Sequence, residues 1–346
     1  MFYPLPPPLT HVDREHLRTL TLQGYLYVNQ HPQAELYISN YTAKTQYDRF
    51  WNEYTLQCRG LIFDQTGKIV ARPFPKFFNL GSEVKMEDLP AEPFEVYEKL
   101  DGSLGVLYWA EGQAQIATRG SFESQQAAYA TRMLHEQYAS ALPRLNPAYT
   151  YLFEIIYPEN RIVVDYHNRE ELILLAIIDT PTGRELPLED IGFPVVRRYD
   201  GITDLNDLEQ HTRGNDEGLV IRFRSGLRLK VKFAEYVRLH RIITGLSELT
   251  VWEYLSEGKS LDALLEQVPD EVYDWVKQVS TELLERYREI ESQCQHVYQE
   301  FPTRKETALY FQQQAHPSVL FAMLNGKDYA PIIWKMLRPK GSNTYF

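Results

Sequence analysis

The stretch that most constrains the fold is residues 94–109, FEVYEKLDGSLGVLYW. Two short runs typical of β-strands, residues 94–97 and 105–109, flank the polar insert Glu98-Lys99-Leu100-Asp101-Gly102-Ser103. Lys99 therefore stands at the end of a strand, where it can be held against a pocket wall. A lysine is a good nucleophile only when it is neutral, and burial or neighbouring cations favour that form.

The same stretch has a simpler interpretation as a β-hairpin whose connection contains a solvated Lys99 and Asp101. Lys-x-Asp-Gly is short enough to occur by chance in a chain of this length. Gly102 would let the backbone turn and approach a ligand closely. The choice between a nucleophile and a plain hairpin depends on the rest of the chain.

The chain has 346 residues, 44% of them hydrophobic and 24% charged, which predicts an ordinary globular protein with one large and one small domain. No apolar run approaches the length of a membrane span. Residues 1–9 lack the basic start and apolar core of a signal peptide and predict a proline-stiffened lead-in. Cys58 and Cys294 are far apart and show no metal-binding spacing, so we expect a reducing cytoplasm.

The net charge of −11 would by itself argue against a nucleic-acid partner. Its distribution changes that conclusion. Residues 246–300 hold 13 acidic and 4 basic side chains, whereas residues 213–241 hold 8 basic and 3 acidic ones. A basic face can coexist with an acidic remainder, so total charge excludes nothing here.

The hydrophobic pattern predicts strands in most of the first 240 residues. Helices are expected at 11–29 and at 123–142, the second with Ser121 as its N-cap. Strands are expected at 36–38, 56–64, 68–72, 114–118, 149–157, 161–166, 171–179, 217–224 and 227–233. The strand at 171–179 is apolar on both faces, which favours an interior position in a sheet.

Beyond Ala234 the pattern becomes helical. Apolar residues recur at steps of three and four between Val272 and Val297, which predicts an amphipathic helix. Further helical runs are expected at 317–324 and 327–337. We therefore expect a domain boundary near residue 240.

Three common functional patterns are excluded. Gly258-Lys259-Ser260 resembles the end of a phosphate-binding P-loop, but position 253 is Glu where that motif needs Gly, and no strand leads into it. The chain also shows no zinc-ligand spacing and no Gly-x-Ser-x-Gly elbow.

What remains is a series of charged residues at the ends of apolar strands, namely Arg59, Lys76, Lys99, Glu154, Glu217, Lys230 and Lys232. Lys230 and Lys232 alternate with apolar residues and therefore share one face of their strand. Each charge alone is ordinary on the polar face of an antiparallel sheet. Their order along the chain is far more specific.

In that order they resemble the nucleotidyltransferase superfamily of ATP-dependent ligases and capping enzymes, and most closely the RNA ligase 1 family of phage-type RNA ligases. The resemblance rests on Lys99-Leu-Asp-Gly for the first motif, 153–161 for the third, 172–179 for the strand that follows, 216–221 for the fourth and 229–232 for the fifth. Upstream, Cys58-Arg59-Gly60 and residues 72–80 resemble elements more particular to RNA ligase 1. The similarity covers roughly residues 50 to 240.

The resemblance implies that Lys99 attacks the α-phosphate of ATP and carries AMP as a lysyl phosphoramidate. The AMP would pass to an RNA 5′-phosphate, and a 3′-hydroxyl would then displace it and seal the strand, as in RNA or tRNA repair. Arg59 and Lys76 would hold the β- and γ-phosphates. Lys230 and Lys232 would contact the α-phosphate and help to keep Lys99 neutral.

The resemblance also assigns the remaining ATP-binding side chains. These are Glu98, Asp101, Gly102, Arg119, Glu154, Glu217 and the cations above. Glu154 would accept a ribose hydroxyl, and Arg119 stands where family members often carry lysine. Mg²⁺ or Mn²⁺ would be held through water by Asp101, Glu154 and Glu217. An apolar side chain from 174–178 and either Phe77 or Phe78 would enclose adenine.

The implied fold class is α+β. A mainly antiparallel nucleotidyltransferase (adenylyltransferase) domain at 1–240 would be followed by a small all-α C-terminal domain at 241–346, where DNA ligases and capping enzymes usually continue into a β-barrel. The RNA path is expected along 213–241 and 76–85. Damaged ends would need a separate kinase or phosphatase. The alternatives are another AMP-transferring enzyme, such as a DNA ligase, and a non-catalytic RNA-binding relic.

Overall fold

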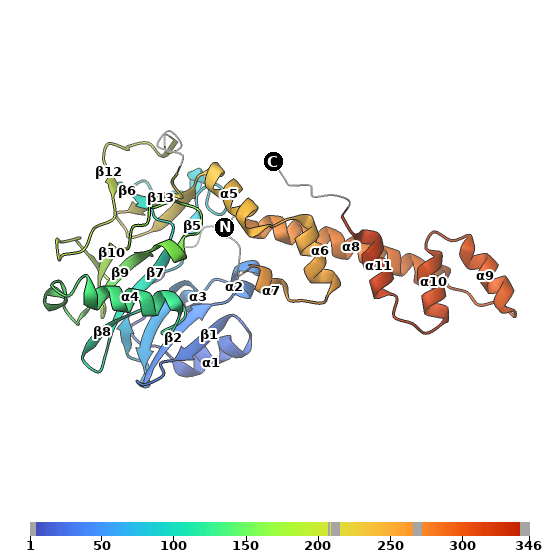
Figure 1. Ribbon diagram of the computed structural model, residues 1–346, viewed down its shortest axis with the longest axis horizontal. Coiled ribbons are helices and arrows are strands. Elements are labelled where there is room, and N and C mark those ends of the chain that lie inside the picture. The colour runs from blue at the N-terminus through green and yellow to red at the C-terminus, as the bar shows by residue number, and fades with distance from the viewer. Residues whose placement is uncertain (1–4, 207, 209–214, 266–271, 340–346) are drawn as a thin grey trace. The chain divides into compact units, whose positions relative to one another are not determined.

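The computed structural model describes residues 5–206, 208, 215–265 and 272–339 (Figure 1). It divides into two compact units, Met1–His240 and Arg241–Phe346. The functional names that the sequence suggested for these two ranges stay predictions.

The first unit contains three β-sheets. Its strands are β1 (Leu26–Gln30), β2 (Leu36–Tyr41), β3 (Arg59–Asp64), β4 (Ile69–Ala71), β5 (Phe78–Asn79), β6 (Phe94–Lys99), β7 (Ser103–Ala110), β8 (Gln113–Ala117), β9 (Tyr149–Ile156), β10 (Glu171–Asp179), β11 (Glu185–Leu186), β12 (Arg198–Tyr199), β13 (Gly218–Phe223) and β14 (Arg228–Lys232). Its helices are α1 (Arg14–Leu22), α2 (Ala43–Tyr47), α3 (Glu53–Gln57), α4 (Gln125–Glu136) and the short 3₁₀ turns η1 (Met86–Asp88), η2 (Leu142–Arg144) and η3 (Pro158–Asn160). Helix α5 (Ala234–Thr244) follows β14.

The sheets have the orders β1-β2-β3-β4, β11-β10-β9-β7-β8 and β12-β6-β13-β14-β5. The pairings between these strands are antiparallel except for β14 with β5, which is parallel. The expected α+β class with mainly antiparallel sheets is therefore confirmed. It follows from short strands joined by tight connections rather than by crossover helices.

The hydrophobic cores lie on the faces of the central sheet β11-β10-β9-β7-β8. On one face α4 contributes Ala130, Met133 and Leu134 to a core shared with β7, β9 and β10. On the other face, residues of β7 to β10 pack against Ile38 and Ile62 of the first sheet. The strand β10 is buried along most of its length, as its continuous apolar run predicted.

The sheet that carries Lys99 has one apolar and one polar face. Val96, Leu219, Ile221 and Leu229 lie in a common core on the apolar face. Side chains alternate across a strand, so the neighbouring residues of β6, β13 and β14 point the other way. That opposite face carries the charged residues discussed below.

The helix expected at 11–29 is wrong over its second half. Helix α1 ends at Leu22, and Gly24 adopts φ +79°. The Tyr25 N–H donates to Leu20 O and the Gly24 N–H to Thr21 O, which is the Schellman end of a helix. The chain then turns back as β1, whose pairing with β2 overrides the helical spacing.

The expected N-cap of the next helix is also corrected. Helix α4 begins at Gln125, and its N-cap is Ser124, whose hydroxyl accepts the Ala127 N–H at 3.1 Å. Ser121 instead accepts the Glu123 N–H within the preceding turn. Both serines have the right chemistry, so composition alone could not separate them.

The second unit is helical in its described residues. Its helices are α6 (Glu248–Ser256), α7 (Leu261–Leu265), α8 (Tyr273–Val297), α9 (Arg304–Gln312), α10 (Pro317–Leu324) and α11 (Ala330–Leu337). The long helix α8 matches the predicted apolar stripe, with Val276, Val279 and Leu283 buried. Trp252 of α6 donates its indole N–H to Trp334 O of α11 at 2.8 Å, which ties the first of these helices to the last.

Candidate active site

Lys99, Glu217 and Lys232 come together at one end of three neighbouring strands. The pairing of β6 with β13 and of β13 with β14 sets Lys99, Gly218 and Lys232 side by side. Glu217 Oε2 lies 2.6 Å from Lys99 Nζ, and its Oε1 lies 3.2 Å from Lys232 Nζ. The Glu217 side chain is 4% exposed and that of Lys99 20%. A nearly buried carboxylate thus bridges two lysines that were expected to share a site.

The sequence placed Glu217 in this site as a water-mediated metal ligand, and its direct bridge between Lys99 and Lys232 was not foreseen. The 2.6 Å contact is a charge-assisted hydrogen bond between Lys99 and Glu217. Glu217 is therefore an acceptor in direct contact with the nitrogen that would have to lose a proton if Lys99 acted as the nucleophile. The site therefore holds Lys99 in place and offers that proton a partner.

Gly218 makes the close approach of these strands possible. A Cβ at this position would lie 1.9 Å from Val231 O and 2.9 Å from the Lys232 Cα. Both are backbone atoms of β14, so the strand would have to move. The Glu-Gly pair of the fourth motif thus has a packing reason in this chain.

Asp101 is committed to the protein rather than to solvent. Its side chain is 3% exposed, and Oδ2 accepts the N–H groups of Val163 and Val164, each at 2.8 Å. Oδ1 accepts the Tyr236 hydroxyl at 2.7 Å. The strand expected at 161–166 does not form, because the N–H groups at 163 and 164 bond to this carboxylate instead of to a neighbouring strand.

Glu154 and Gly102 contact each other close to Lys99. The Gly102 N–H donates to Glu154 Oε1 at 3.0 Å. A Cβ on Gly102 would lie 2.6 Å from Ile155 O, so this glycine admits strand β9 and is not in a positive-φ turn. Burial raises the pKa of the Glu154 carboxyl to about 8, Lys99 opposes that rise, and Glu217 adds to it. Glu154 is therefore mostly protonated at neutral pH in the free protein.

Two of the cations expected at the ATP site, Lys76 and Arg119, lie near the same aromatic wall. Lys76 Nζ lies 5.5 Å from the ring centres of Trp51 and Phe78 and 5.8 Å from that of Tyr41. The Arg119 guanidinium lies 5.6 Å from the same Tyr41 ring. Cation–π contact can hold such groups in place without neutralising their charge. We call Lys76 and Arg119, with Arg59 below, the cation cluster.

Arg59 joins this cluster through its neighbours. Its guanidinium lies 5.5 Å from the Phe77 ring centre, and a Cβ on Gly60 would lie 3.2 Å from Arg119 O. Arg59 Nη1 is buried and has no hydrogen-bond partner within the described part of the chain. Buried donors are rarely left unsatisfied, so an anion is the natural partner for this nitrogen.

Lys230 and Glu98 take different sides of the sheet. Lys230 is opposite Val220, which is opposite Tyr97, so it lies on the Lys99 face one step along the strands. Glu98 is opposite Leu219, and alternation places it on the other face of β6 from Lys99. The assignment of Glu98 to the same pocket thus stays a prediction from the family resemblance.

Of the residues expected to enclose adenine, Phe78 is buried in a core, whereas Phe77 and Leu175 are partly exposed. Phe78 is 4% exposed and packs in the core on the apolar face of the Lys99 sheet. Phe77 and Leu175 are half-buried and border one common core cluster. Of the two aromatic candidates, Phe77 keeps the exposure that a base would need.

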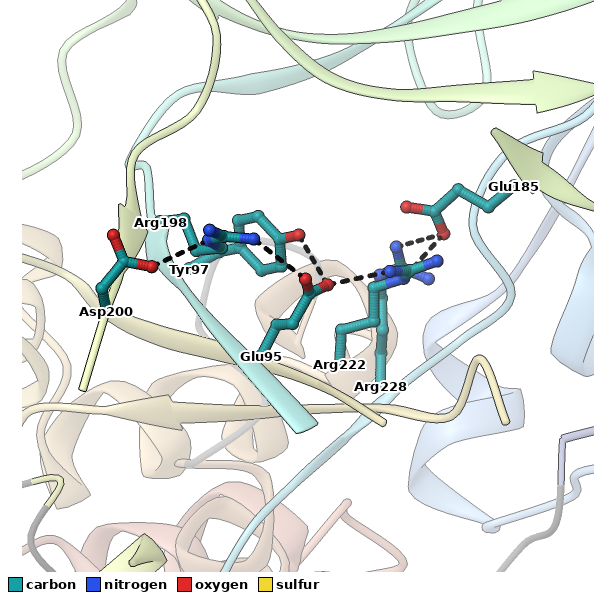
Figure 2. A network of polar contacts seen from close by, with 7 residues as sticks. All are labelled: Glu95, Tyr97, Glu185, Arg198, Asp200, Arg222 and Arg228. Atoms are coloured by element: carbon teal, nitrogen blue, oxygen red, sulfur yellow. Dashed lines mark hydrogen bonds and ion pairs between the residues drawn. The ribbon is translucent and has the colours of Figure 1, made fainter. Parts of the chain in front are cut away.

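A network of charges extends from this site along the polar face of the sheet and was missed in the sequence. Its members are Glu95, Tyr97, Glu185, Arg198, Asp200, Arg222 and Arg228 (Figure 2). Glu95 and Tyr97 share the Lys99 face of β6 by alternation. In the sequence, only the alternation of charged residues in β6 and β14 indicated this network. The strands β11 and β12 have two residues each, which is too short for a pattern.

This network joins two sheets. Glu185 of β11 contacts Arg228 and lies 3.3 Å from Arg222, whereas Arg222 also binds Glu95 of β6 at 2.9 Å. Partial burial raises the pKa of Glu95, but the Tyr97 hydroxyl and the guanidiniums of Arg222 and Arg198 outweigh it and hold that pKa below its usual value. The arginines of 213–241 that were expected to bind RNA are thus largely paired with acids. Arg213 itself lies outside the described residues.

The carboxylates expected to hold a metal fit it unequally. Among the described residues no three His, Cys, Asp or Glu side chains converge as direct ligands. Glu154 and Glu217 flank Lys99 and could act through water on a hydrated Mg²⁺. Asp101 fits poorly, because three protein donors already occupy its buried carboxylate.

Comparison with known proteins decides the family. Residues 57–237, just over half of the chain, match the family model described as RNA ligase. The chain belongs to the RNA ligase family. The expected resemblance to phage-type RNA ligases is thereby confirmed, and the matched range contains Arg59, Lys99, Glu154, Glu217 and Lys232.

Curated relatives agree. The chain is 32% identical to a putative RNA ligase of Thermovibrio ammonificans, over 56% of this chain and 55% of that protein. It is 25% identical to an RNA ligase of Rhodothermus phage RM378, over 90% of this chain and 89% of that one. The match thus spans about half the length of the Thermovibrio protein and most of the phage protein.

Among solved structures, an archaeal ATP-dependent RNA ligase superposes with a TM-score of 0.48 and 15% identity, covering 92% of this chain and 97% of that one. At this level of similarity the family assignment rests on the sequence matches. Separately, none of the helices in the described ranges has the length and apolarity needed to cross a membrane.

Proposed function

We propose that this RNA ligase family member is an ATP-dependent RNA ligase that forms a lysyl-AMP at Lys99. The observation that carries the proposal is the set of Lys99, Glu217 and Lys232 held together at the ends of β6, β13 and β14. The relatives named RNA ligase support the choice of acceptor.

In the first step Lys99 Nζ attacks the α-phosphorus of ATP. A P–N bond forms, the bond from phosphorus to the bridging oxygen breaks, and pyrophosphate leaves. Lys99 must first lose its extra proton, and Glu217 is the acceptor in contact with it at 2.6 Å. Lys232 and Lys230 lie on the same face and would stabilise the charge that develops on the α-phosphate.

The cation cluster of Arg59, Lys76 and Arg119 would bind the β- and γ-phosphates. The unpartnered, buried Arg59 Nη1 supports this role, because a phosphate oxygen would satisfy it. Mg²⁺ or Mn²⁺, when bound, supplies further neutralisation of phosphate charge. Glu154 and Glu217 would hold such an ion through water, and Glu154 would have to give up its proton to do so.

In the second and third steps AMP passes to an RNA 5′-phosphate, and an RNA 3′-hydroxyl then displaces it. The test is to incubate a 5′-phosphorylated linear RNA with ATP, magnesium and the protein and to look for circular RNA. We expect circles only when ATP is present. A labelled protein that never yields circles would favour AMP transfer to another acceptor, and RNA binding with no label would favour a non-catalytic relic.

Finer assignments rest on less. We infer that residues 1–240 form the adenylyltransferase domain and that the helical unit positions a structured RNA such as a nicked tRNA, with end healing left to a separate kinase or phosphatase. Cys58 and Cys294 are buried and free, which supports a reducing cytoplasm. Sealing of a nicked anticodon loop and of linear RNA, with and without 241–346, tests the tRNA role. Equal losses on both substrates would remove it.

A further inference from the structure

The proposed function fixes where the RNA 5′-phosphate must arrive. Displacements at phosphorus place the entering and leaving groups roughly in line. Lys99 enters opposite the departing pyrophosphate, so the RNA phosphate that later displaces Lys99 must enter from the side that pyrophosphate vacated. In this chain that side is the cation cluster of Arg59, Lys76 and Arg119. The first bases of the RNA must therefore lie beside this cluster.

Near the cluster along the chain lies a stack of two aromatic rings, of which Phe50 is exposed and Tyr25 is half-buried. The ring centres of Tyr25 and Phe50 are 4.0 Å apart, with 13° between their planes. Phe50 directly precedes Trp51, whose ring lies 5.5 Å from Lys76 Nζ. The Thr42 N–H donates to Tyr25 O, so Tyr25 is paired with the residue after Tyr41. Phe50 is thus the chain neighbour of Trp51, and the backbone of Tyr25 is bonded to the chain neighbour of Tyr41.

The loop that carries Arg119 rests on the strand that Tyr25 leads into. Asn29 of β1 donates its amide to Gly120 O at 2.7 Å. A Cβ on Gly120 would lie 2.0 Å from the Tyr27 hydroxyl, so this loop touches β1 directly. Tyr25, two residues before Tyr27, therefore belongs to the same surface as the Arg119 loop.

The stack has the composition of a single-strand binding surface. Phe50 is 36% exposed and is the one aromatic side chain among the large exposed hydrophobic residues of the described ranges. Lys44 Nζ lies 3.5 Å from the Tyr25 ring centre and 3.3 Å from Asp48 Oδ2, and the Lys44 side chain is 39% exposed. Exposed rings beside cations bind unpaired bases by stacking and the backbone by charge.

An alternative path for the RNA strand runs along residues 213–241. In that stretch Arg222 and Arg228 pair with Glu185, and Arg238 pairs with Glu235. Lys44 likewise has an acidic neighbour, Asp48, so the feature that distinguishes the first surface is the exposed ring of Phe50 rather than free charge. The aromatic stack is therefore the more suitable surface for the RNA bases next to the reacting phosphate.

We propose that Tyr25, Phe50 and Lys44 form the surface on which the 5′-terminal bases of the phosphorylated RNA strand stack before AMP transfer. The inference rests on the proposed function, since it uses the geometry of that reaction. It assigns single-stranded RNA, read through base stacking and not through base sequence, to a surface outside the ATP site.

The test compares wild type with Phe50→Ala in two separate assays. Formation of labelled lysyl-AMP from α-labelled ATP needs no RNA, and we expect it to change less than about twofold. Transfer of that AMP to a 5′-phosphorylated single-stranded oligonucleotide should need about tenfold more RNA for half-saturation, from the loss of one stacked base. Phe50→Trp should keep wild-type affinity, and Leu22→Ala, which removes a side chain 79% exposed at the end of α1, should change neither assay.

Abasic nucleotides identify the base that stacks. Removing the base at each 5′-terminal position in turn should weaken wild-type binding about tenfold at one or two positions. The same removal should cost Phe50→Ala little, because its partner ring is already gone. The inference would be overturned if wild type and Phe50→Ala bound RNA equally well, or if removing a base weakened both equally. Label on Lys99 would in that case still support the ligase proposal. Absence of label from wild type would overturn both.

Discussion

Glu154 has a raised pKa, although its proposed role beside a hydrated metal ion requires the ionised carboxylate. Burial raises its pKa to about 8, and Glu217 adds to the rise. The Gly102 N–H and Lys99 oppose the rise but do not cancel it. The free protein therefore stores Glu154 in its neutral form near pH 7, ready to ionise when positive charge enters the site.

This proton predicts a pH-dependent stability. A carboxyl whose folded pKa lies above its unfolded value favours folding fully at low pH and loses that contribution as the pH rises through 8. In metal-free buffer, the free energy of unfolding of Glu154→Gln relative to that of wild type should rise between pH 5 and pH 9, by on the order of 4 kcal/mol.

Urea unfolding at several pH values measures this difference. Glu136→Gln, a change at an exposed position of α4, serves as the control and should track wild type. A constant gap between Glu154→Gln and wild type over the whole range would contradict the buried-proton explanation.

At the scale of elements, short irregular pieces decided what the sequence could and could not predict. The β13–β14 hairpin that ends at Lys232 was predicted because alternating apolar residues mark it clearly. The β-hairpin considered for residues 94–109 does not form, because β6 pairs with β12 and β13 whereas β7 pairs with β8 and β9 in a different sheet. The segment at 161–166 looked like a strand, but Asp101 draws its N–H groups away. That contact joins residues about 60 positions apart, which no local pattern encodes.

The charge network between the sheets gives a prediction at the same scale. Glu185 is 17% exposed and contacts both Arg222 and Arg228, so Glu185→Gln removes the carboxylate beside Arg228 and leaves Arg222 with Glu95 alone. We expect a loss of about 2 kcal/mol in the free energy of unfolding. Arg198→Ala, at a side chain 52% exposed, should cost less than about 0.5 kcal/mol.

Thermal or urea unfolding of the two variants checks the comparison. Both sites lie in the network of Figure 2, so they differ mainly in burial. Equal losses would mean that Glu185 does not join the sheets energetically.

At the scale of the whole molecule, the order of motifs along the chain was more informative than any single residue. It predicted the family that the comparison over 57–237 confirms. It also predicted the meeting of Lys99, Glu217 and Lys232, because the family order implies strand neighbours. It did not predict the bridging role of Glu217 or the commitment of Asp101, which depend on side-chain distances within the folded chain.

The measurement that tests the central claim most directly is labelling of Lys99. The purified protein is incubated with magnesium and α-labelled ATP and run on a denaturing gel beside Lys99→Ala. The control is Lys85→Ala, which replaces a lysine whose side chain is 72% exposed. Wild type and Lys85→Ala should carry acid-labile label, and Lys99→Ala should carry none. Label that persists in Lys99→Ala, or none on a folded wild type that intact mass shows to be free of AMP, would contradict the proposed mechanism.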